Sequence, residues 1–184
     1  MMQFRGFTLI ESVIVIALGA CMMVAIAVLA FHFNGTVSYQ QAIAQSSGSA
    51  SAVMREIELF TLPSSAVLET HSFSDSSYTS SSTVLVLEVP SIDSSNNSIA
   101  NAYDYAAFYT DGTNAYRLLE ANTLSRRASG TKKLSSTIHT LTFAYDSVDF
   151  AEVKMITVDV QTQALIKQDV LSDHRNERIR LRNR

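Results

Sequence analysis

Hydrophobic residues are distributed unevenly along this chain of 184 residues. From Val13 to Phe33 no residue carries a formal charge, and only Gly19 and His32 interrupt the apolar and small side chains. As a helix, a run of about 20 such residues spans the roughly 30 Å of hydrocarbon in a bilayer. The pattern therefore predicts a membrane-length helix close to the N-terminus.

Apolar residues continue at helical spacing beyond this run. This apolar stripe consists of Ile43, Ala50, Val53, Met54, Ile57 and Phe60. Pro63 predicts the end of the helix, because the residue before a proline is pushed out of the helical region. We expect one helix from about Thr8 to Thr61, half in lipid and half amphipathic. Asn34-Gly35 and the segment 46–49 are weak helix formers. The alternative to one continuous helix is therefore a membrane anchor followed by a flexible linker and a separate short helix.

The rest of the chain has the patterns of β-strands. We expect strands at Thr83 to Val89, Tyr103 to Tyr109, Ala115 to Leu119, Ile138 to Asp146 and Val153 to Thr162. The Asp111-Gly112 pair, between the second and third of these, predicts a hairpin. The serine-rich segments 72–82 and 91–98 lack periodicity and predict surface loops.

The last two expected strands alternate between apolar and polar residues. The apolar positions are Leu141, Phe143 and Tyr145 in one strand and Ile156, Val158 and Val160 in the other. Alternation is typical of an antiparallel sheet with one covered face, and the helical stripe is the natural cover. The expected fold class is α+β, with a long N-terminal helix packed on a C-terminal antiparallel β-sheet domain.

This reading divides the chain into four parts. Residues 1–6 precede the apolar run, 7–33 form a transmembrane helix, 34–62 its amphipathic continuation, and 63–184 a β-rich globular domain. Removing residues 1–33 leaves about 150 residues, which is one domain by length.

Composition excludes several classes of function. A net charge of −3 is too small to indicate a polyanionic partner, and the single cysteine, Cys21, lies in the apolar run, so a disulfide within the exported domain is excluded. An arginine-rich tail from Arg175 to Arg184 could contact DNA or anionic lipid. The alternation of Ile179 and Leu181 instead favours an edge strand with an exposed arginine face, so nucleic acid is not an expected partner.

Enzyme and metal signatures are missing from the sequence. The four histidines have no metal-ligand spacing, and there is no phosphate-binding loop, nucleophile elbow or CxxC pair. Asp93, Asp104 and Asp111 lie in or near expected loops without EF-hand spacing, and we interpret them as solvated surface acids. We expect no catalytic residue, no cofactor and no metal ligand.

The N-terminal residues carry a sharper signal. Gly6 is followed by Phe7-Thr8-Leu9-Ile10-Glu11 and then by the apolar run, which resembles the type IV prepilin signature. The resemblance implies that prepilin peptidase cleaves after Gly6 and that Phe7 becomes N-methylated. It also implies that Glu11 acts in assembly, by pairing with the free amine of Phe7 on a neighbouring subunit.

Two alternatives compete with this interpretation. A secretory signal peptide has a short apolar region before a small-residue cleavage site, whereas this apolar run is too long and its cut lies before it. A plain single-pass anchor would carry Gly6 and Glu11 by chance. In either topology, Arg5 precedes the span and the next basic residue is Arg55, so the positive-inside bias places the N-terminus in the bacterial cytoplasm. The globular domain then lies outside the inner membrane, and the prepilin resemblance implies that it later enters a pilus or pseudopilus.

A looser resemblance covers the C-terminal part. Residues 86–93, 103–105, 116–118, 141–145 and 179–183 are similar in order to J-type pseudopilins and W-type minor pilins. Many major pilins have a C-terminal disulfide, which this chain lacks. The resemblance implies a structural subunit that assembles into, or primes, a type IV pilus or a type II secretion pseudopilus. Its implied partners are prepilin peptidase, other pilin subunits, an inner-membrane assembly platform and, before assembly, membrane lipid.

Two other classes of function remain open. A tip adhesin or DNA-uptake receptor on the same scaffold would be favoured by an exposed aromatic or arginine-lined groove. An anchored enzyme would need a pocket with convergent titratable groups, and the sequence offers no such set.

Overall fold

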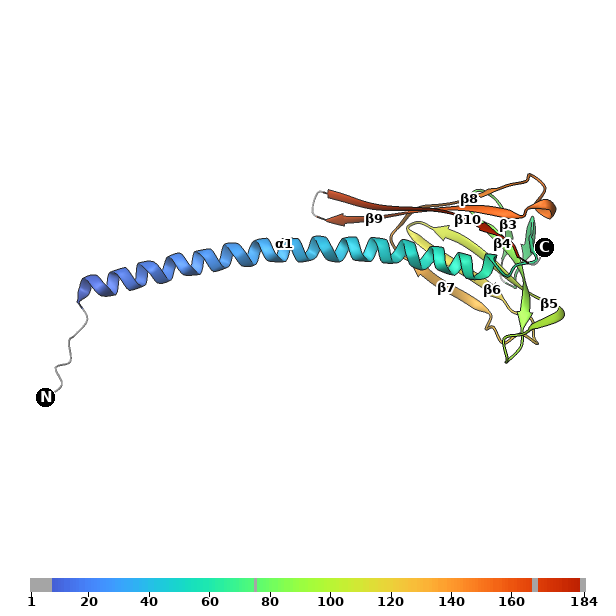
Figure 1. The fold of residues 1–184 in the computed structure, drawn as a ribbon, viewed down its shortest axis with the longest axis horizontal. Coiled ribbons are helices and arrows are strands. Elements are labelled where there is room, and N and C mark those ends of the chain that lie inside the picture. Colours follow the sequence, from blue (N-terminus) through green and yellow to red (C-terminus); the bar gives the residue numbers. More distant parts are fainter. Residues whose placement is uncertain (1–7, 75, 167–168, 183–184) are drawn as a thin grey trace. The chain divides into compact units, whose positions relative to one another are not determined.

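The computed structural model describes residues 8–74, 76–166 and 169–182. Contacts divide the chain into two compact units, Met1–Gln41 and Ala42–Arg184, which are described separately. Helix α1 (Leu9–Thr61) begins in the first unit and ends in the second (Figure 1). Its 53 residues confirm the single long helix predicted from the sequence.

The second unit is otherwise built from antiparallel strands. They are β1 (Ala66–Val67), β2 (Thr70–Ser72), β3 (Ser77–Thr79), β4 (Leu85–Ile92), β5 (Ser98–Asp111), β6 (Asn114–Glu120), β7 (Gly130–Ser135), β8 (Ile138–Tyr145), β9 (Met155–Ile166) and β10 (Asp169–Arg180), with a short 3-10 helix, η1 (Phe150–Glu152), between β8 and β9. The order β1-β4-β5-β6-β7 forms a five-stranded sheet, β10-β9-β8 a three-stranded sheet, and β2-β3 a separate hairpin. The α+β prediction is therefore confirmed.

The last turns of α1 lie between the two larger sheets (Figure 1). The buried apolar residues of the helix are Ala50, Val53, Met54, Ile57 and Phe60. They join one core with the inward faces of both sheets, including Leu87 and Phe108 on one side and Val158 and Val160 on the other. The buried residues of the predicted helical stripe and the alternating apolar residues of β8 and β9 therefore pack together in this core. Ile43 was wrongly placed in the stripe: its side chain is 43% exposed and borders a shallow hollow beside Leu171.

Polar contacts fix the same helix to the sheets. Glu56 accepts hydrogen bonds from Arg117 on β6 and Lys132 on β7. The Arg117 guanidinium also lies 4.8 Å from the centre of the Phe60 ring, within the range of a cation–π contact. On the side of the three-stranded sheet, the hydroxyl of Ser46 on α1 lies 2.7 Å from the hydroxyl of Thr162 on β9, and both are buried. Such directional contacts fix the rotation of the helix, which apolar packing alone leaves adjustable.

Several local predictions need correction. Strand β4 continues through Pro90 to Ile92, because β1 pairs only as far as Glu88 and leaves no ladder partner on that side for a proline to disrupt. The segment 72–82 was predicted to be a surface loop, but Ser72 ends β2 and Ser77–Thr79 forms β3, which pairs with it. The hairpin at Gly112 is confirmed, with φ of 57° at that glycine and Asp111 paired with Asn114.

The β2-β3 hairpin covers the outer face of the five-stranded sheet. A second buried cluster lies there, formed by Phe73, Val86 and Ala107. Leu68, Tyr78, Val84, Tyr105 and Leu118 pack around it. The five-stranded sheet is therefore covered on both faces, by α1 on one side and by the hairpin on part of the other. This explains why β4 reads as a nearly continuous apolar run.

Asp104 was predicted to be a solvated acid, and this is wrong because its side chain is fully buried. It accepts hydrogen bonds from the hydroxyls of Ser91 and Ser125, the backbone N–H of Asn122 and the guanidinium of Arg127. Burial alone would raise the pKa of this carboxyl, but these donors outweigh burial and hold the pKa below its ordinary value. Asp104 thereby ties the segment after β6 to strands β4 and β5.

The arginine-rich tail agrees with its prediction. Strand β10 lies at the edge of its sheet, Ile179 and Leu181 are each 4% exposed, and Arg178 and Arg180 are exposed. Like charges on an open edge discourage pairing with another chain.

We expect a chain beginning at Gly35 to be soluble, monomeric and mixed α/β by circular dichroism. In that chain, Ile57→Asp should lower the free energy of unfolding by at least about 3 kcal/mol, because it buries an unpaired charge between helix and sheets. Leu59→Asp, at a position 63% exposed, is the matched control and should cost less than about 1 kcal/mol. Urea unfolding measures both, and equal losses would contradict the packing described here.

Asp104→Asn should lower the free energy of unfolding at pH 7 by about 3 kcal/mol, because it removes the charge that compensates Arg127. The folded carboxyl has a lowered pKa, so its contribution is present above the unfolded value of about 3.9 and disappears as the pH falls through the folded pKa. The difference between wild type and variant should therefore shrink in acid. The control is Asp111→Asn, at an exposed position, which should change little at any pH. A constant difference between pH 7 and pH 2 would rule out the ionised role.

Candidate functional site

The N-terminal end of α1 places Glu11 in a defined hydrogen-bonded arrangement. Its Oε2 atom accepts from the Thr8 backbone N–H at 2.9 Å and from the Thr8 hydroxyl at 3.0 Å. The Glu11 N–H in turn contacts the Thr8 hydroxyl oxygen at 3.4 Å. These reciprocal bonds form a capping box, in which a threonine and a glutamate three residues later satisfy free donors at the start of a helix.

The sequence carried the signal for this box, because Thr8-Leu9-Ile10-Glu11 has the required spacing. The prepilin resemblance implies a partner for Glu11 on another subunit, and the structure adds a partner, Thr8, within its own chain. The intramolecular bonds reduce the penalty for placing a carboxylate near lipid, because a satisfied acceptor costs less to bury than an isolated one. Gly6 and Phe7, the predicted cleavage and methylation residues, lie outside the described residues.

Behind the capping box, α1 exposes a continuous apolar surface. All 15 large hydrophobic side chains between Leu9 and Phe33 are exposed, from 51% at Val28 to 84% at Leu9. Within the described part of the chain, α1 is the one helix long and apolar enough to cross a membrane. A surface of this kind requires lipid or other apolar helices around it.

Aromatic side chains form a connected row on the outer face of the five-stranded sheet. Its members are His71, Phe73, Tyr78, Tyr105, Tyr109 and Tyr116. His71 stacks on Tyr105 with ring centres 3.8 Å apart, and Tyr109 stacks on Tyr116 at 5.5 Å. Burial, followed by the hydrogen bond and charge of Tyr78, raises the pKa of Tyr109 to about 12. Tyr109 is therefore uncharged near neutral pH.

An open pocket of about 350 Å³ lies at the Tyr105 end of this row. Its lining residues are Tyr103, Tyr105, Glu120, Ala121, Asn122 and Thr123. The Nε2 atom of His71 donates to Oε2 of Glu120 at 2.9 Å, so the hairpin helps to orient the pocket carboxylate. The buried Asp104 fixes the opposite wall by accepting from the N–H of Asn122. Sequence patterns did not reveal this pocket, because its residues come from β5, β6 and the segment that follows β6.

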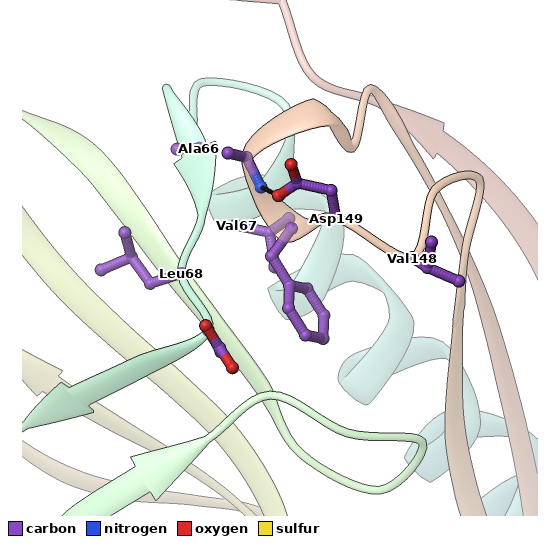
Figure 2. A pocket seen from close by; sticks show the side chains of 8 residues that line it. Ala66, Val67, Leu68, Val148 and Asp149 are labelled. Carbon is purple, nitrogen blue, oxygen red and sulfur yellow. Dashed lines mark hydrogen bonds between the residues drawn. The ribbon is translucent and has the colours of Figure 1, made fainter.

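A second hollow, of about 340 Å³, lies between the β1 region and the loop that contains η1 (Figure 2). Val67 and Leu68 supply apolar lining, and Asp149 accepts from the Ala151 N–H within η1 (Figure 2). Val148, on the adjoining loop, has a fully exposed side chain. The carboxylate of Asp149 is engaged as a helix cap, while the exposed side chain of Glu69 also borders the hollow.

The described residues contain no group of three or more His, Cys, Asp or Glu side chains that could hold a metal ion. His174 and Asn176 both donate to Oδ2 of Asp159 on the outer face of the three-stranded sheet. Burial opposes ionisation of Asp159, but these two donors prevail and lower the pKa of its carboxyl. This cluster lies on a strand surface rather than in a pocket.

Comparison with known proteins bears on the N-terminal segment. Residues 1–27 match the family model described as the prokaryotic N-terminal methylation motif. No curated protein and no solved structure gives a significant match to the chain. The matched region contains the capping box and most of the exposed apolar surface of α1. The motif implies processing by prepilin peptidase and assembly with other pilin subunits, and it points to a structural subunit.

The chain thus carries a prokaryotic N-terminal methylation motif on a long apolar helix that is followed by antiparallel sheets, an arrangement consistent with a type IV pilin-like protein.

Proposed function

We propose that this protein is a minor pilin or pseudopilin, which assembles into, or primes, a type IV pilus or a type II secretion pseudopilus. The observation that carries the proposal is the match of residues 1–27 to the methylation motif, on a helix whose large apolar side chains are all exposed up to Phe33. The resemblance to J-type pseudopilins and W-type minor pilins supports a low-abundance role.

In this proposal, residues 1–6 are a leader and residues 7–33 hold the subunit in the inner membrane, with the N-terminus cytoplasmic. The amphipathic segment 34–62 joins this anchor to the globular domain 63–184. Assembly moves the apolar helix from lipid into a bundle of similar helices. The exchange is nearly neutral in apolar burial, because lipid tails and apolar side chains are similar environments, so polar contacts decide it.

Glu11 is the charged side chain of this helix that can make such a polar contact during assembly. Within one subunit its carboxylate accepts from uncharged Thr8 donors, whereas a protonated amine would add charge to the hydrogen bond. We infer that the amine of Phe7 on a neighbouring subunit supplies this charge after cleavage. Processing would then precede assembly, because the amine is formed only when the bond after Gly6 is cut.

A second candidate function is a binding module at the fibre tip. The row of aromatic side chains and the pocket beside Tyr103 and Glu120 favour it, since half-buried aromatic surface next to a carboxylate is typical of recognition sites. Both functions use the same anchor and the same processing.

Processing is tested by coexpression with a prepilin peptidase. The wild-type chain should lose residues 1–6 and gain one methyl group on its new N-terminal Phe7, as measured by intact mass. Gly6→Leu should remain uncleaved, because a bulky side chain is not expected to fit at the scissile bond. Ser12→Ala, beyond the cleavage site, is the control and should be cleaved. A wild-type chain that stays intact would remove the basis of the assignment.

The role of Glu11 is tested with Glu11→Leu in the native host lacking the wild-type gene. Membrane insertion should be unimpaired, because removal of a charge favours insertion by up to about 3 kcal/mol. Leader cleavage should continue, while recruitment into the fibre or secretion should fall strongly. Glu58→Gln, at an exposed carboxylate later on α1, is the matched control and should assemble normally. Full incorporation of Glu11→Leu would show that the ion pair is dispensable.

A further inference from the structure

We propose that the pocket formed by Tyr103, Tyr105 and Glu120 binds a basic side chain, lysine or arginine, of a partner protein. This site is separate from the N-terminal motif and is not required by the assembly proposal. Its three defining residues come from two neighbouring strands: Tyr103 and Tyr105 from β5 and Glu120 from β6.

The register of the strands places these residues on one face. Tyr103 and Tyr105 are two positions apart on β5, so both project from the outer face of the sheet. Tyr105 is directly paired with Glu120 on β6 and with Glu88 on β4. Directly paired residues of an antiparallel sheet have neighbouring side chains, so a tyrosine ring lies between two carboxylates.

The charges around this ring favour a cation. Burial raises the pKa of Tyr105, and the negative charges of Glu88 and Glu120 raise it further, so the phenol is neutral near pH 7. Oε2 of Glu120 is occupied by His71, but Oε1 has no hydrogen-bond partner among the described residues. The Glu120 side chain is 39% exposed, which leaves this oxygen accessible to a ligand.

The ring of Tyr103 adds a second attraction of the same sign, whereas one face of Tyr105 is already covered by the stacked ring of His71. Aromatic faces attract lysine and arginine head groups through the ring quadrupole, and nearby carboxylates strengthen that field. A pocket of about 350 Å³ is small, but it accommodates one head group with part of its aliphatic stem lying along the rings. The combination of rings, a free carboxylate oxygen and a small open volume therefore fits a single basic side chain.

The wall formed by Asn122 and Thr123 makes the site preorganised. Asn122 is held by the buried Asp104, and Glu120 is oriented by His71 from the β2-β3 hairpin. Contacts of this kind reduce the ordering that a ligand would otherwise impose on the pocket.

The experiment uses the full-length chain in detergent micelles, with NMR signals of labelled tyrosine rings and of the Asn122 and Thr123 amides. The probes are Nα-acetyl-lysine amide and Nα-acetyl-arginine amide, each at about 10 mM, where a millimolar dissociation constant is detected. Glucose is the neutral probe for a sugar site. We expect saturable shifts of the pocket signals with both basic probes, weakened by added salt.

Glu120→Gln should weaken binding by about tenfold, because it keeps the shape of the side chain and removes its charge. Tyr103→Leu should weaken binding to a similar extent by removing a ring, and thermal unfolding checks that this variant folds. The controls are Glu69→Gln, a carboxylate beside the other hollow, and Tyr39→Leu, an exposed tyrosine on the first unit. Both should bind like wild type.

Three results would overturn the proposal: no saturable shift with either basic probe, equal affinity of Glu120→Gln and wild type, or saturation by glucose without saturation by the basic probes. The last result would assign the pocket to a sugar. Because binding is measured on the isolated chain, its failure leaves the assembly proposal intact. Conversely, a chain that is never processed or assembled could still bind the probes.

Discussion

Burial of one face of α1 between two antiparallel sheets is the interaction on which the rest of the globular unit depends. The buried residues from Ala50 to Phe60 lie in one core with the inward-facing residues of both sheets. Without the helix, the apolar residues that both sheets turn toward it would be exposed to water. The Glu56 contacts with Arg117 and Lys132 then fix the rotation of the helix, because an ion pair tolerates less sliding than an apolar surface.

Much of the fold could be predicted because its strongest patterns are local. The helix ends near Pro63, and β8 and β9 alternate cleanly, so their buried positions were read correctly from spacing alone. Three features depended on tertiary context instead. Pro90 is accepted inside β4 because the short β1 leaves that side unpaired. The serine-rich β2-β3 hairpin lacks periodicity because it lies on the sheet surface. Ile43 matches the helical spacing, but the strands beside it do not cover it.

The candidate sites also differ in whether local sequence or tertiary structure determines them. The N-terminal motif is contiguous and could be recognised from the sequence, while the roles of Gly6, Phe7 and Glu11 stay predictions. The Thr8–Glu11 capping box was present in the same residues and was overlooked. The aromatic pocket could not be found, because it needs the register that pairs Tyr105 with both Glu88 and Glu120. Asp104 was misread for a related reason. An aspartate near an expected loop is usually solvated, and only the fold brings four donors to its carboxylate.

The apolar part of α1 and the globular domain are subject to different physical requirements, because one suits lipid and the other is solvated by water. Near its N-terminus, α1 is apolar all round, as a helix in lipid must be, and the carboxylate of Glu11 is satisfied there by local hydrogen bonds. On the globular domain water solvates charged groups, so recognition can use several polar and aromatic side chains at once. The inner face of the five-stranded sheet is committed to α1. The outer face is only partly covered by the β2-β3 hairpin, and the row of aromatic side chains ends there at an open pocket. A surface for partners can therefore vary on the outer face without disturbing the core that holds the helix.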